Sequence, residues 1–265
     1  MNKFVVVIFP DDAKADEGVR AFQALHDEGE ITLYGLRVAR KSEEGEVTLV
    51  EKVGKGMPGA AVGALAGGLV GLLGGPLTAV AGLAGGAWIG TWRDITHLGV
   101  GSDFLEEVSR ELAPGTTAVI ADITEDRVAP LDERMAALDG TVLREWQTEY
   151  GEMRLVAEAA ARKAEIEHLE AERRAAPDAR QKLLDIRLDK AVRRLDDVAA
   201  RARSELEALA QRSDSKLETL ERQADTAGAD ARQSIERRIA EIRDDRARRE
   251  RLLEQALEIA QEARA

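Results

Sequence analysis

Residues 58–90, PGAAVGALAGGLVGLLGGPLTAVAGLAGGAWIG, contain no charged side chain, although 33% of the whole chain is charged. Glycine recurs there at every fourth position, and the same spacing restarts after the Gly74-Gly75-Pro76 break. Gly and Pro together favour a turn, and this spacing lines the glycines in one row on each of two short helices. We therefore expect residues 56–92 to form an apolar helical hairpin. Its predicted glycine-zipper positions are Gly59, Gly63, Gly67, Gly71, Gly75, Gly82, Gly86 and Gly90.

The glycine rows favour close approach of another helix. Glycine costs about 1 kcal/mol relative to alanine inside a helix, so eight of them are an expensive way to build an ordinary soluble core. In lipid, by contrast, a row of glycines lets helix backbones pack tightly together. We interpret the rows as oligomerisation contacts in or at a membrane, with a buried core in a soluble protein as the alternative.

The flanks of the hairpin predict its orientation. Each arm is short, roughly 24 Å at about 1.5 Å per residue, whereas a full span needs about 30 Å. Lys52 and Lys55 precede the insert and Arg93 follows it, which places both ends on the cytoplasmic side by the positive-inside rule. Trp88 and Trp92 lie one turn apart, as interfacial anchors do. The sequence thus predicts a hairpin that inserts from the cytoplasmic face.

The insert interrupts an α+β head that is predicted to comprise residues 1–55 and 93–148. The order of its elements is β-α-β-β-(insert)-α-β-α-β, which is that of a ferredoxin-like sandwich with an additional αβ unit. Apolar β-branched runs predict the strands, and capped amphipathic runs predict the helices. The expected strands are residues 3–9, 31–41, 46–53, 116–123 and 141–147, and the expected helices are 11–30, 101–115 and 125–138.

The segment after the hairpin carries a family resemblance. The sequence matches a family pattern over about residues 1–147. In this pattern a glycine-rich apolar insert is followed by an aromatic residue and then by a Pro-Gly pair that ends a helix. The matching residues are Gly99-Val100, Phe104, Leu112, Pro114-Gly115 and Thr116-Thr117-Ala118. This part of the chain resembles the bacterial domain of unknown function 1269 family. The resemblance implies a membrane-associated protein of unassigned activity and supplies no catalytic residue.

Residues 149–265 are predicted to be helical, with breaks near Pro177 and Gly228 only. Apolar residues keep a heptad spacing as far as Leu209, after which we expect Ser213, Leu217 and Leu220 to continue the seam through a stutter. Such a narrow, alanine-rich stripe needs a partner, so this tail is predicted to be a coiled coil. From Met153 onward the chain has 25 basic and 25 acidic side chains, and we interpret them as a solvated helix surface.

Composition excludes several classes of function. The net charge of −12 belongs wholly to the first 152 residues, and nucleic-acid binding requires a basic patch instead. Cysteine is absent, so disulfides and thiolate metal sites are excluded. The three histidines are isolated in the sequence, without the partners of a triad or metal site. We therefore predict no enzyme, catalytic residue, cofactor or metal.

The expected function is a non-enzymatic scaffold on the cytoplasmic side of the cell membrane. Its hairpin would insert into lipid and oligomerise through the glycine rows, and the tail would mediate assembly with other copies or with a protein partner. Two alternatives stay open. The hairpins of many copies could form a pore or channel, although the insert offers only Thr78 and Thr91 as polar lining. A soluble homo-oligomer could also bury the hairpins in a shared core.

Overall fold

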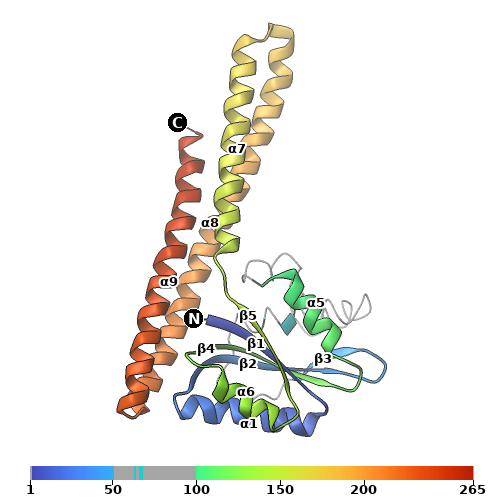
Figure 1. The fold of residues 1–265 in the computed structure, drawn as a ribbon. Coiled ribbons are helices and arrows are strands. Elements are labelled where there is room, and N and C mark those ends of the chain that lie inside the picture. Colours follow the sequence, from blue (N-terminus) through green and yellow to red (C-terminus); the bar gives the residue numbers. More distant parts are fainter. Residues whose placement is uncertain (1, 51–62, 64–65, 68–99, 265) are drawn as a thin grey trace. The chain divides into compact units, whose positions relative to one another are not determined.

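The chain forms two compact units. The computed structural model describes residues 2–50, 63, 66–67 and 100–264 (Figure 1). The first unit, here called the head unit, combines Met1–Thr148 with Asp214–Ile242. The second, here called the helical unit, combines Glu149–Ser213 with Arg243–Ala265. The head unit therefore includes a part of the predicted tail.

The head unit is built on an antiparallel sheet, which confirms the predicted α+β class. Within the described residues the sheet has five strands in the order β3-β2-β4-β1-β5. Every neighbouring pair is antiparallel. The strands are β1 (Asn2–Phe9), β2 (Ile31–Lys41), β3 (Val47–Val50), β4 (Thr117–Glu125) and β5 (Thr141–Trp146).

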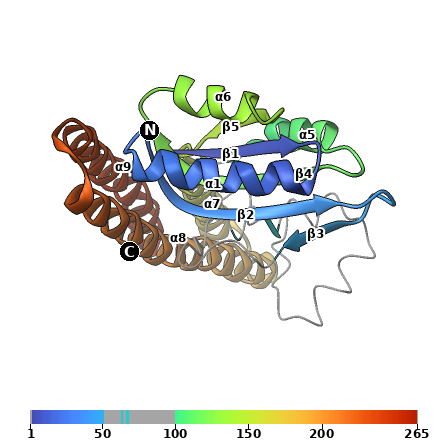
Figure 2. The same cartoon turned by 90° about the horizontal axis from the view of Figure 1, so that it is seen from below.

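Helices cover both faces of this sheet. Successive side chains of a strand point to opposite faces, so β1 contributes to two apolar cores. Val5 and Val7 pack with α1 and α6, and Phe4 and Val6 pack with α5 on the other face. Figure 1 shows α1 and α6 together below the strands and α5 above them, and Figure 2, seen from below, shows α1 in front of the strands. These helices are α1 (Asp12–Asp27), α5 (Ser102–Glu111) and α6 (Ala129–Ala136).

The C-terminal region is helical, as the sequence predicts. Its breaks fall at the two expected places, beside Pro177 and at Gly228. The residues between the breaks are rich in Ala, Leu, Glu and Arg, which are strong helix formers. The helices are α7 (Tyr150–Ala175), α8 (Asp178–Thr226) and α9 (Ala229–Glu262).

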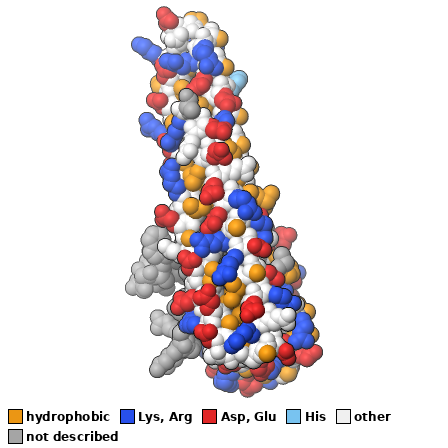
Figure 3. Space-filling view, turned by 90° about the vertical axis from the view of Figure 1, so that its left-hand side faces the viewer, with side chains coloured by type: hydrophobic (Ala, Val, Ile, Leu, Met, Phe, Trp, Pro, Cys, Tyr) orange, Lys and Arg blue, Asp and Glu red, His pale blue; other side chains and the backbone are white. Residues whose placement is uncertain are grey.

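The helical unit has its own apolar core and one buried ion pair. Leucine and alanine side chains of α7, α8 and α9 form a single cluster. Within it, Arg249 Nη2 lies 2.5 Å from Glu152 Oε1, and both side chains are almost fully buried. Burial raises the pKa of Glu152 above its usual value. On the face drawn in Figure 3, acidic and basic side chains alternate along the helices, as expected for a solvated helix surface.

Three residues of the apolar insert are described, namely Gly63, Ala66 and Gly67. Ala66 is fully buried and belongs to the core between the sheet and α5. A Cβ atom placed on Gly63 or Gly67 would have no described neighbour within 4 Å. No helix among the described residues is long and apolar enough to cross a membrane. The described part of the insert therefore contacts the head through Ala66.

This difference between neighbouring positions predicts opposite effects of enlarging them. Ala66→Leu should overpack the core and lower the free energy of unfolding by about 1–3 kcal/mol. Gly67→Ala adds a methyl group where nothing described lies close, so it should raise helix stability by about 0.5–1 kcal/mol. Urea unfolding followed by circular dichroism measures both. Equal effects at the two positions would contradict the packing of Ala66.

Candidate functional site

The most elaborate polar contact in the head unit lies beneath Asp214–Ile242, which we call the docked hairpin. It consists of the end of α8, the turn at residues 227–228 and the start of α9. Only a few apolar side chains hold it to the sheet, chiefly Leu220, Ile235 and Ile242 against Tyr34. Several polar side chains of the hairpin are also buried against the head, namely Lys216, Gln223 and Arg238.

The sheet presents polar side chains at this position because β4 changes character along one face. Ile120 belongs to the apolar core beneath α5. Two and four residues later the same face carries Asp122 and Thr124, which are 2% and 1% exposed. In β2, the buried Thr32 and Tyr34 likewise alternate with Ile31 and Leu33 of the opposite face. Half of this sheet face is therefore polar and requires polar partners.

Lys216 of α8 supplies the first of these partners. Its Nζ lies 3.0 Å from Asp122 Oδ1 and 2.9 Å from Oδ2. The same ammonium group lies 3.3 Å from Gln147 Oε1 and 4.7 Å from the centroid of the Tyr34 ring. Gln147 also donates its amide N–H to Asp122 Oδ1 at 2.8 Å. A carboxylate, an amide oxygen and an aromatic face thus surround one ammonium group.

Tyr34 is fixed by a second chain of hydrogen bonds. Its hydroxyl lies 3.0 Å from Thr124 Oγ1, which in turn donates to Asn2 Oδ1 at 2.7 Å. Burial raises the pKa of Tyr34 well above its ordinary value. The phenol therefore remains protonated and neutral at any physiological pH, and its ring is held in place beside Lys216.

Gln223 joins α8 to the start of β2. Its amide group donates to the carbonyl of His26 at 2.6 Å and to that of Ile31 at 2.8 Å. Its Oε1 accepts from Thr32 Oγ1 at 2.6 Å. Every polar group of this buried side chain therefore has a partner in the head, in keeping with the high cost of leaving any of them unpaired.

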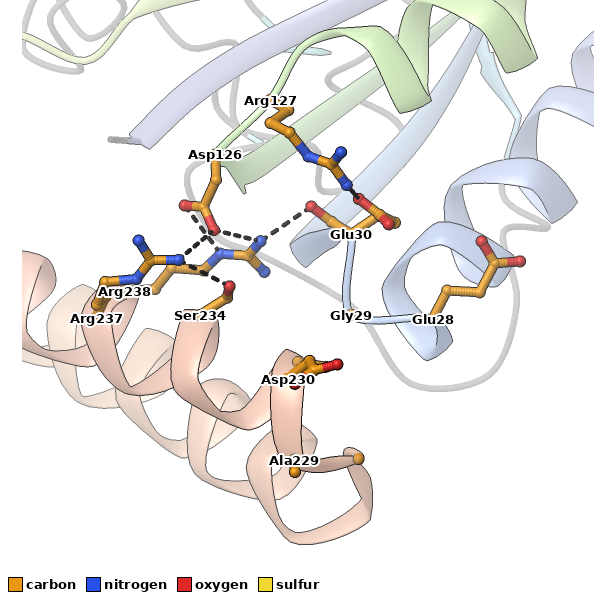
Figure 4. Close-up of a pocket in the computed structure, with 12 residues that line it drawn as sticks. Glu28, Gly29, Glu30, Asp126, Arg127, Ala229, Asp230, Ser234, Arg237 and Arg238 are labelled. Atoms are coloured by element: carbon orange, nitrogen blue, oxygen red, sulfur yellow. Dashed lines mark hydrogen bonds and ion pairs between the residues drawn. The ribbon is translucent and has the colours of Figure 1, made fainter.

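Arg238 of α9 closes the far end of the interface. Its side chain is 1% exposed. The guanidinium donates to Thr32 Oγ1 at 3.1 Å, to the carbonyl of Glu30 at 2.9 Å and to Asp126 Oδ2 at 3.1 Å. Five fixed N–H donors make arginine suited to such a set of acceptors. Figure 4 shows the side chain reaching from α9 to both the β2 and the β4 ends.

A cavity of about 720 Å³ opens beside Arg238, between the turn at Gly228 and the loops at Gly29 and Asp126 (Figure 4). The hairpin approaches closely here, because a Cβ on Gly29 would lie 2.7 Å from Ala231 Cβ. Gly29 also has a φ of +78°, which favours glycine. The charged lining residues are Glu28, Glu30, Asp126, Asp230, Arg127, Arg237 and Arg238.

The charges of this cavity largely neutralise one another. Arg127 pairs with Glu30 at 2.8 Å, and both Arg237 and Arg238 face Asp126. Such a lining has no excess of positive charge with which to attract an anion. Among the described residues, no group of three or more His, Asp or Glu side chains is arranged to hold a metal ion. At this site the sheet binds cationic side chains.

Most of the sequence-predicted site residues lie outside the described residues. Gly63 and Gly67 are the described members, and the structure brings no described side chain to either. The other members cannot be placed. They are Gly59, Gly71, Gly75, Gly82, Gly86, Gly90, Lys52, Lys55, Trp88, Trp92 and Arg93.

The residues of the docked hairpin were missed by the sequence analysis, which treated the tail's charges as solvated. The buried positions after Leu209 are Ser213, Lys216, Leu220 and Gln223, a regular 4-3-4-3 spacing. Ser213 and Leu220 are buried as expected, but the buried position between them is Lys216 and not Leu217, so the heptad spacing continues without the expected stutter. Lys216 and Gln223 occupy the same core position in two successive heptads, and this pattern was the available signal for a polar partner.

Comparison with known proteins assigns one stretch of the chain. Residues 60–159 match the family model described as Protein of unknown function (DUF1269). This stretch is similar to the DUF1269 family. The match supports the family resemblance but differs in extent, since it omits residues 1–59 and runs into α7. No curated protein and no solved structure matches the chain. Asp122 lies inside the DUF1269 match, whereas Tyr34 and the docked hairpin lie outside it.

Neighbouring arginines on α9 allow a matched test of the polar interface. Arg238→Met would remove the N–H groups that donate to Asp126, Thr32 and the Glu30 carbonyl. We therefore expect a loss of about 2–4 kcal/mol in the free energy of unfolding. Arg237→Met alters a side chain that is 67% exposed and should change it by less than about 0.5 kcal/mol. Urea denaturation distinguishes the two. Similar losses for both variants would show that Arg238 contributes nothing beyond surface charge.

The half-buried His26 should make the stability of the head unit depend on pH. Burial lowers the pKa of His26 below its ordinary value, and its Nδ1 accepts from the Leu33 N–H at 3.3 Å. The unfolded chain therefore takes up a proton near pH 6.5 while the folded chain stays neutral. Stability is complete above that pH and falls as the pH drops below it.

The expected result is a drop in Tm between pH 7.5 and 5.5 that is larger for the wild type than for His26→Gln. Differential scanning fluorimetry at several pH values measures both curves, and their difference isolates His26 from the other titrating groups. Parallel curves for the two proteins would refute the assignment.

Proposed function

We propose that this chain is a non-enzymatic scaffold that associates with the cytoplasmic face of the cell membrane and self-assembles through the glycine rows of its insert. The observation that carries the proposal is the contrast within the described part of the insert. Ala66 is buried in the head core, whereas Gly63 and Gly67 have no described atom within 4 Å of a Cβ position. A helix backbone from another copy fits such a surface.

The other parts of the chain suit a scaffold. The sheet order β5-β1-β4-β2, with β3 added at one edge, agrees with a ferredoxin-like sandwich as the architecture of the head. The heptad spacing of α7, α8 and α9 and their common apolar cluster support a coiled-coil tail. The nearly equal numbers of acidic and basic side chains in the tail allow copies to approach with little net repulsion.

The flanking charges support the membrane part of the proposal. Lys52, Lys55 and Arg93 place both ends of the insert on one side, and its uncharged residues tolerate an apolar environment. A second candidate is a soluble homo-oligomer that buries the inserts in a shared core. The burial of Ala66 in the head favours it, because that contact holds part of the insert against protein.

The double substitution Gly63→Leu/Gly67→Leu tests self-assembly. Leucine at both positions should leave the fold of the single chain intact, since no described atom obstructs it. It should abolish the native oligomer, because two large side chains would occupy the surface that another helix approaches. Cross-linking and mass photometry in detergent measure assembly, and fractionation with carbonate washing measures membrane recovery.

Alanine at the same two positions is the matched control and should weaken the oligomer less. An oligomer that survives the leucine substitutions would refute the glycine contact. Recovery of the wild-type protein wholly in the soluble fraction would reject membrane association and favour the soluble homo-oligomer.

A further inference from the structure

The surroundings of Lys216 have the composition of a binding site for an amine. Three groups that surround its Nζ belong to the sheet side of the head. Asp122 comes from β4, Tyr34 from β2 and Gln147 from the residue that follows β5. Lys216 is separated from Asp122 by 94 residues of sequence. The site is therefore made by the sheet, and the docked hairpin only supplies its occupant.

The site has a strong physical requirement for a cation. Asp122 is 2% exposed, and a buried carboxylate that loses its counter-charge is strongly destabilised. Without Lys216, the side-chain donor left to Asp122 among the described residues is the Gln147 amide at 2.8 Å. One neutral amide does not neutralise a carboxylate. Any cation of suitable shape that reaches this position would therefore be bound.

The geometry selects a primary ammonium group. Both oxygens of Asp122 and the Gln147 Oε1 lie within 3.3 Å of a single nitrogen, and the Tyr34 ring lies on another side at 4.7 Å. A compact ammonium with three donors satisfies these acceptors together with the aromatic face. A guanidinium is planar and broader, so it does not place one nitrogen at the centre of the set.

We infer that Tyr34, Asp122 and Gln147 form a primary-ammonium site on the sheet face, which the chain's own Lys216 fills. A free alkylamine, or a lysine of a second copy, would occupy it by the same contacts whenever Lys216 is absent or withdrawn. Because both occupants need one position, binding of an external ammonium and docking of Lys216 exclude each other. This coupling acts in both directions, and it is independent of the glycine rows.

Chemical rescue tests the site. Lys216→Ala removes three carbons and the nitrogen, which correspond to n-propylammonium. The variant should have a lower Tm than the wild type. Adding n-propylammonium chloride should raise its Tm by about 2–4 °C with saturation, since a ligand that binds only the folded state stabilises it. So small a ligand is expected to saturate in the range of about 1–100 mM.

Three comparisons make the result specific. The wild type, whose site is filled, should show no saturating rise. The variant should show none with 1-propanol or with guanidinium at equal ionic strength. Lys216→Ala/Asp122→Asn should also fail to respond, although it lacks the buried charge and should fold at least as well as Lys216→Ala. A similar rise in the wild type or in the double variant would overturn the proposal.

The test remains decisive if Lys216→Ala does not fold by itself. In that case recovery of the helical circular dichroism signal on adding n-propylammonium, but not 1-propanol, is the expected result. No recovery at any concentration would overturn the proposal. Mixing full-length Lys216→Ala with full-length Asp122→Asn assigns the source of the ammonium. A hetero-complex in native mass spectrometry that forms with Asp122→Asn, but not with Lys216→Ala/Asp122→Asn, identifies the lysine of a second copy as an occupant. Rescue by n-propylammonium without that difference identifies free amines.

Discussion

The buried carboxylate of Asp122 is the constraint on which the head unit depends. A five-stranded sheet that was apolar on both faces would need only helices such as α1, α5 and α6 to cover it. Asp122, Thr124, Thr32 and Tyr34 instead make half of one face polar, and a charge at 2% exposure requires a counter-charge. Lys216 provides it. This single requirement explains why a part of the C-terminal helices belongs to the same compact unit as the N-terminal strands.

Local patterns were enough to predict the elements of the fold, because each pattern is contained in a few consecutive residues. The strand at residues 31–41 and the helix breaks beside Pro177 and Gly228 follow from β-branched runs and from Pro and Gly. The docked hairpin was not predictable in that way. Lys216 and Arg238 meet partners that are 94 and 112 residues away, and nothing in their neighbouring sequence separates them from the solvated charges of the tail. Only their place at buried heptad positions distinguishes them.

The insert poses a different problem, since its sequence and its described contacts favour different environments. Regular glycine spacing without charge suits a helix packed closely on other helices. Ala66, however, is buried among Phe104 and Val108 of α5 and the sheet residues beneath them. The two observations agree if one side of the segment rests on the head while the glycine side stays accessible. The DUF1269 match begins at residue 60, so it includes both the buried Ala66 and the glycines Gly63 and Gly67.

The distance in sequence between Asp122 and Lys216 has a consequence during synthesis. Protein chains are made from the N-terminus at about 5–20 residues per second, so the 94 residues that separate the pair take about 5–20 s to emerge. Once β5 has emerged, the five described strands of the sheet have been made while Asp122 still has no lysine. The nascent head is therefore a species with its own surface chemistry, negatively charged and open on the face that the finished protein covers, and its maturation ends only when α8 arrives.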